Sequence, residues 1–132
     1  TGGLGAFGFR VLASGTFTNC TGGMYAFAAE GTASGTFTGC IGGMYAFAGN
    51  GTASGTFTNC TGGDIAFGGL LTASGKFTNC TSGDNAFGGS GTAPGGKFYH
   101  CTGGANTFTE TGDPAPVHLF CILNNTQYSG ND

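Results

Sequence analysis

The chain has 132 residues, including 30 glycines and 13 phenylalanines, and a formal net charge of −3. Its only basic residues besides histidine are Arg10, Lys76 and Lys97, too few to neutralise a nucleic-acid backbone. No apolar run approaches the roughly 18–20 residues of a membrane span, so we expect neither a nucleic-acid partner nor a membrane span. Glycine lacks the three-residue period of collagen, and many aromatics with low charge argue against disorder.

From Val11 onward, one twenty-residue phrase recurs. It reads VLASGTFTNCTGGMYAFAAE, then GTASGTFTGCIGGMYAFAGN, then GTASGTFTNCTGGDIAFGGL. Such a fixed period is typical of solenoids. One residue is inserted in GTAPGGKFYHC, where we expect a bulge or a longer turn near Gly95 and Gly96. The chain does not begin with methionine and shows no signal peptide, and we expect it to be a mature or excised piece.

Phenylalanine repeats every ten residues, with one slip at the insertion. The series is Phe7, Phe17, Phe27, Phe37, Phe47, Phe57, Phe67, Phe77, Phe87, Phe98 and Phe108. In stacked coils these rings would form two internal columns, because one coil cannot bury its own ring.

The segment TASGTFT alternates hydroxyl residues with Ala33, Gly35 and Phe37. This period of two predicts a strand with the phenylalanine inward, and glycine and threonine are poor helix residues. We therefore predict an all-β β-solenoid of about six 20-residue coils with a stacked Phe core, each coil having two short strands, one before and one after the Gly-Gly turn. The Gly-Gly steps should be narrow turns that need positive φ or close backbone approach.

The two ends depart from the repeat. TGGLGAFGF aligns with TGGMYAFAA, so we expect residues 1–112 to be solenoid repeats that start in mid-coil. Residues 113–132 should form a degenerate last coil that acts as a C-terminal cap. In this coil His118 replaces the expected phenylalanine, and Tyr128 stands where Phe108 would recur.

One cysteine falls in each coil, at Cys20, Cys40, Cys60, Cys80, Cys101 and Cys121. Stacked Cα atoms about 4.8 Å apart fall within the disulfide range, so three disulfides between coils would suit an oxidising compartment. The alternative is an inward column of free thiols. Evenly spaced single cysteines do not resemble a metal site.

Asp64 and Asp84 occupy equivalent positions one coil apart. Two carboxylates about 5 Å apart would suit a retaining glycosidase or a calcium site, but no arginine or aromatic platform accompanies them. His100 and His118 do not share a position in the repeat, and no Ser-His-Asp arrangement is visible. We expect no enzyme activity, no catalytic residue, no metal and no cofactor.

Asn-x-Thr sequences begin at Asn19, Asn50, Asn59, Asn79 and Asn124. They are glycosylation acceptors if the source has that machinery. The alternative to glycosylation is that the asparagines form a stacked column at a turn.

The phrase SGTFT places two outward threonine columns on one face: Thr16, Thr36 and Thr56, with Thr18, Thr38 and Thr58. This Thr-x-Thr array resembles the ice-binding face of insect antifreeze β-solenoids, which implies ice binding as an alternative function. The likeness covers three coils, because Lys76 and then Lys97-Phe98-Tyr99 interrupt the pattern.

The whole repeat, FTNCTGGMYAF, is similar to repeats of chlamydial polymorphic outer-membrane passenger domains. It also looks like the Gly-rich SGTFTNCTGG arrays of bacterial surface proteins and phage tail fibres. The likeness implies a structural or adhesive module of an extracellular or virion-surface fibre. Its partners would be further copies, other fibre subunits or surface glycans.

Overall fold

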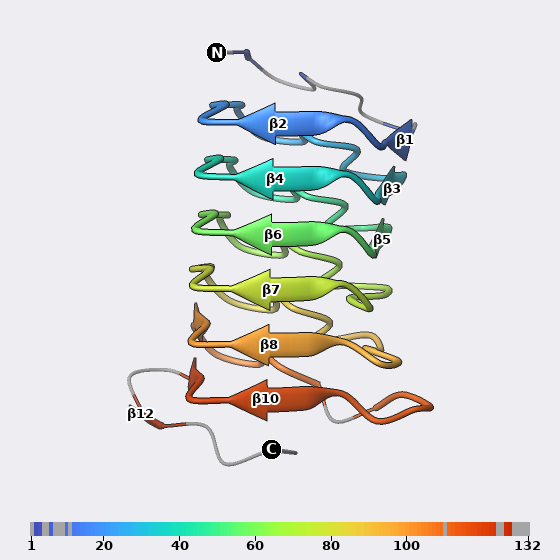
Figure 1. The fold of residues 1–132 in the computed structure, drawn as a ribbon, viewed down its shortest axis with the longest axis vertical. Coiled ribbons are helices and arrows are strands. Elements are labelled where there is room, and N and C mark those ends of the chain that lie inside the picture. Colours follow the sequence, from blue (N-terminus) through green and yellow to red (C-terminus); the bar gives the residue numbers. More distant parts are fainter. Residues whose placement is uncertain are drawn as a thin grey trace.

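The chain forms a right-handed stack of about six coils (Figure 1). The computed structural model describes residues 2–3, 6, 10, 12–109, 111–123 and 126–127. In Figure 1 the front strands run from right to left, and the chain returns behind them while it descends toward the C-terminus. No helix occurs in these ranges, so none is present there that could cross a membrane. The predicted all-β solenoid is confirmed.

The largest sheet takes one strand from each coil. Its strands are β2 (Thr16–Thr18), β4 (Thr36–Thr38), β6 (Thr56–Thr58), β7 (Lys76–Thr78), β8 (Lys97–Tyr99) and β10 (Val117–Leu119). Neighbouring strands are parallel and in register, so Phe37 pairs with Phe17 on one side and with Phe57 on the other. Because the register does not slip, equivalent residues form straight columns along the stack.

Two small sheets flank this large sheet. The first contains β1 (Leu12–Ala13), β3 (Thr32–Ala33) and β5 (Thr52–Ala53). The second contains β9 (Thr102–Gly103), β11 (Ile122–Leu123) and β12 (Thr126–Gln127). In the second coil β3 and β4 therefore both belong to the TASGTFT half, before the Gly-Gly step.

The core consists of two interlocked columns of phenylalanine rings. Within a column the rings stack, as Phe37 and Phe57 do with centroids 4.9 Å apart. Between columns they meet edge to face, as Phe47 and Phe57 do at 5.8 Å and 87°. Both arrangements suit the ring quadrupole. Complete burial holds for Phe27, Phe37, Phe47, Phe57, Phe67, Phe77, Phe87 and Phe98.

The columns change at both ends of the described stack. Phe17 is only partly buried and Phe108 is 4% exposed, while Phe7 lies outside the described residues. His118 pairs with Phe98 in register, stacks on it at 4.8 Å and is buried. The histidine therefore continues the column at the position that the repeat assigns to phenylalanine.

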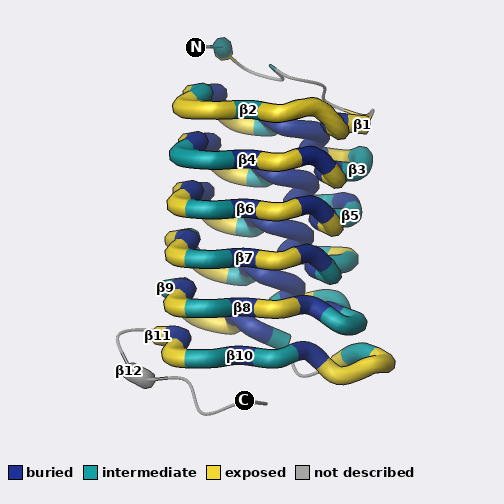
Figure 2. Tube along the Cα trace, viewed as in Figure 1, coloured by how far each residue is buried: buried dark blue, intermediate teal, exposed yellow. Residues whose placement is uncertain are grey.

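The second half of each coil, behind the front strands, is a series of turns, so the second extended segment predicted after the Gly-Gly turn is wrong. In the second coil Tyr45, Phe47 and Ala48 have φ of 61°, 52° and 57°, and the next coils repeat the pattern. The left-handed region costs a non-glycine residue roughly 1–2 kcal/mol. Complete burial of the Phe47 ring offsets a cost of that size. Figure 2 shows this half of the coil as a mostly buried segment.

Close packing favours glycine at the first position of the Gly-Gly step in the second and third coils. A Cβ on Gly42 would overlap the Cβ of Ala46, and Gly42 is not among the positive-φ residues. Of the two predicted reasons for glycine at this step, close approach is the one that applies.

The inserted residue lies in a tight turn, at the place where a bulge or a longer turn was predicted. The N–H of Gly96 donates to the carbonyl of Ala93 at 3.0 Å, and Gly95 has φ of 66°. Proline followed by a positive-φ glycine suits a type II turn. The extra residue is absorbed before β8, so Phe98 stays in register with Phe77.

The last coil continues the parallel stack and then reverses direction. β10 pairs with β8 and β11 with β9, both parallel, whereas β12 runs antiparallel to β11. An antiparallel strand cannot continue this parallel sheet with the same register. The boundary at 112/113 and the capping role stay predictions.

Replacing Phe57 by alanine should destabilise the fold by about 3–5 kcal/mol, because it leaves a ring-sized cavity between stacked neighbours. The free energy of unfolding in urea measures this cost. Thr56→Ala, on the exposed side of the same strand, should stay within about 0.5 kcal/mol of the wild type. Equal costs for the two variants would contradict the stacked core.

Candidate functional site

The outer face of the large sheet presents two straight columns of side chains. The structure places Thr16, Thr36, Thr56 and, beside them, Thr18, Thr38, Thr58 in register on β2, β4 and β6. The first column is exposed, and the second is half-buried on β4 and β6. Three coils thus form a regular hydroxyl surface with a rung spacing of about 4.8 Å.

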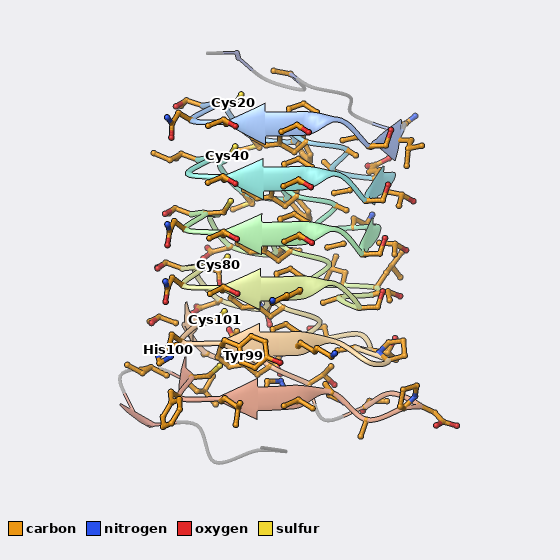
Figure 3. All side chains as sticks on the ribbon, in the orientation of Figure 1. Cys20, Cys40, Cys80, Tyr99, His100 and Cys101 are labelled. Carbon is orange, nitrogen blue, oxygen red and sulfur yellow. The ribbon has the colours of Figure 1, made fainter. Side chains whose placement is uncertain are left out.

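Below β6 the same columns carry different chemistry. Lys76 and Lys97 pair in register at the first position, and Thr78 pairs with Tyr99 at the second. The ring of Tyr99 lies over the front of the sheet (Figure 3), and Nζ of Lys76 is 5.9 Å from its centroid. A cation at that distance is attracted to the ring face. The face therefore changes from hydroxyl to basic and aromatic along the rod.

The two lysines have no acidic partner among the described residues. The described part of the chain contains one ion pair, between Arg10 Nε and Glu30 Oε2 at 2.7 Å. Lys76 and Lys97 are both exposed and lie directly opposite each other on adjacent strands. Like charges in this arrangement are mildly destabilising, so the face would gain from an anionic partner.

Asp64 and Asp84 form a second charged column beyond the next corner of the coil. Asp64 Oδ1 accepts the backbone N–H of Asp84 at 2.9 Å, and Asp84 Oδ1 accepts that of Ala105 at 2.7 Å. Each carboxylate thus links its coil to the next one. Both side chains are exposed, and no cluster of three or more potential metal ligands occurs in the described residues.

The corner after each large-sheet strand requires a left-handed residue. Asn19, Asn59 and Asn79 have φ between 52° and 54°, and asparagine tolerates this region better than most residues. The equivalent positions are Gly39, His100 and Phe120, with φ of 62°, 53° and 55°. The asparagine column thus has a conformational cause, and its side chains are exposed.

His100 and His118 lie in different environments. His100 is exposed at the corner (Figure 3) and stacks on Phe120 at 5.2 Å. His118 is inside the core. Phe120 is 67% exposed and was not predicted as a surface residue. Aligning its HLFC with FTNC would have revealed it, since phenylalanine there replaces asparagine.

An apolar patch on the first two coils was also missed. Met24 and Met44 are 42% and 37% exposed, and the neighbouring rings of Tyr25 and Tyr45 stack at 5.2 Å. The Asp64 and Asp84 positions continue the methionine column downward. The same side of the rod is therefore apolar in its upper coils and acidic below.

The six cysteines follow one inner edge of the stack. The Cys60 thiol donates to the carbonyl of Phe37 in the preceding coil at 3.3 Å, and the Cys80 thiol does the same to Phe57. Burial raises the pKa of Cys40 and of Cys101 above that of an exposed thiol. Only Cys20 is partly exposed, and the choice between free thiols and disulfides stays a prediction.

Comparison with family models, with curated proteins and with solved structures found no match to the chain. The resemblances to surface-protein and tail-fibre repeats stay predictions from the sequence motifs. The function is therefore inferred from the surfaces of the rod.

A thiol reagent such as DTNB should label Cys20 rapidly in the native chain and the five buried cysteines slowly, because burial hinders access of the reagent. Without reductant, denaturation should expose all six thiols. The absorbance of the released chromophore counts them. A denatured chain with no free thiol would show that three disulfides had formed.

Proposed function

We propose that the chain is a non-catalytic, self-associating structural module of an extracellular or virion-surface fibre, with adhesion through its side faces. The single observation that supports this most is the continuity of the aromatic columns through the described coils. A stack held together along its whole length is a rigid rod. Its outward positions are free to contact partners.

The chemistry of the surface favours contact over catalysis. The Asp64 and Asp84 carboxylates both accept backbone N–H groups, which gives them a structural role. The exposed faces instead offer flat arrays: threonines on β2, β4 and β6, lysines on β7 and β8, and the apolar patch around Met24 and Met44. Flat repetitive faces suit partners that are themselves repetitive.

The chain should self-associate in a concentration-dependent manner, because parallel rods present matching repetitive faces. Sedimentation velocity over a wide concentration range, with electron microscopy of the largest species, measures this. A chain that stays monomeric at every concentration would contradict the proposal.

Ice binding is the second candidate function, and the in-register threonine columns favour it. Lys76, Lys97 and Tyr99 interrupt the array, so we expect no thermal hysteresis beyond ordinary freezing-point depression. Nanolitre osmometry measures the gap between melting and freezing. If a gap appears and Thr36→Lys, which copies the residue at position 76, removes it, ice binding replaces the fibre proposal.

A further inference from the structure

The charges on the sides of the rod form two pairs with the same axial spacing. Lys76 and Lys97 are in-register partners on adjacent strands. Asp64 and Asp84 are also stacked one coil apart, joined by the hydrogen bond from the Asp84 N–H to Asp64 Oδ1. Because adjacent rungs are about 4.8 Å apart, the basic pair and the acidic pair repeat at the same distance along the axis.

Both pairs bring like charges together without a counter-ion from the described part of the chain. The one ion pair found there, Arg10 with Glu30, involves neither pair. All four side chains are exposed. Each pair is therefore a site of unneutralised charge, of opposite sign to the other.

The two pairs lie on different sides of the coil. The lysines are on the front sheet, whereas the aspartates follow the left-handed corner at Asn59 and Asn79 and the turn beyond it. A contact between the basic pair of one copy and the acidic pair of another therefore joins unlike surfaces. Such a heterologous contact leaves both end copies with a free pair and can continue as an open row.

We propose that rods of this chain associate side by side, with Lys76 and Lys97 of one copy facing Asp64 and Asp84 of the next. The long axes are parallel lines, running in the same or in opposite directions, because two pairs of equal spacing can meet at one axial shift only in such an arrangement. The proposal rests on the self-association proposed above and names the surfaces that carry it. The ion pairs orient the rods, and their attraction is screened by salt.

The repeat itself supplies matched substitutions. Thr36 and Thr56 occupy the lysine position in earlier coils, so Lys76→Thr and Lys97→Thr introduce a residue that the fold already accepts. Met24 and Met44 occupy the aspartate position, so Asp64→Met and Asp84→Met do the same. Arg10→Gln with Glu30→Gln removes one charge of each sign elsewhere and serves as the control.

The experiment is sedimentation velocity of the full chain at about 20 mM and about 300 mM salt. Wild type and control should associate alike, and association should weaken about tenfold at the higher salt. The double lysine-to-threonine and double aspartate-to-methionine variants should each weaken association at low salt about tenfold, since each removes two ion pairs. Circular dichroism verifies that each variant is folded.

A charge exchange tests the pairing directly. Chains with Lys76→Glu and Lys97→Glu carry two acidic surfaces, and chains with Asp64→Lys and Asp84→Lys carry two basic ones. Neither chain should associate alone, and an equimolar mixture should recover association. If the second chain does not fold, the lysine-to-threonine and aspartate-to-methionine variants alone test the pairing.

Two further outcomes would overturn the pairing. Wild-type association that both double variants retain would place the contact on another surface while leaving the fibre proposal intact, whereas a wild type that never associates overturns both. A second outcome is that a sulfated heparin hexasaccharide binds the chain through the lysines while the aspartate variant associates like wild type. In that case the basic pair is a polysaccharide site.

Discussion

The stacking of phenylalanine rings between successive coils is the interaction on which the structure depends. Ring centroids within a column are 4.6 to 4.9 Å apart over most of the stack, which matches the rung spacing of parallel strands. Backbone hydrogen bonding and ring stacking thus require the same axial distance. A residue inserted into a coil must be accommodated before the next phenylalanine, and the turn at Gly95 does this for the one inserted residue. The buried half of the coil tolerates residues with left-handed φ because its phenylalanine rings must point into the core of the stack.

Outside this core the residue type at a given column position differs from coil to coil. The position occupied by Thr16 carries threonine in three coils and then Lys76, Lys97 and Val117, with no change in strand pairing. A side chain that points to solvent costs the stack little, so each coil can carry different surface chemistry. The rod therefore separates stability, which resides in the inward columns, from surface chemistry, which varies along the outward ones.

Much of the fold followed from periodicity alone. The solenoid, the inward phenylalanines and the turn at the insertion were all predicted, because burial and rung spacing act on every repeat in the same way. The turns around Tyr45 and Phe47 were not predicted, since phenylalanine and tyrosine have no local preference for left-handed φ. The partly exposed Met24 and the exposed Phe120 were also missed. Their exposure depends on corner geometry that a period of two does not describe.

The sequence by itself determined the coil length, the strand that carries TFT and the columns that face inward, because these follow from the recurrence of apolar residues. Only the tertiary structure decided the hand of the coil, the burial of the cysteine column and the hydrogen bonds of the aspartates. It alone also placed the basic and acidic pairs on different sides of the rod. These features depend on how the chain turns between strands, where close packing and left-handed residues set the direction and the repeat pattern carries no periodic signal.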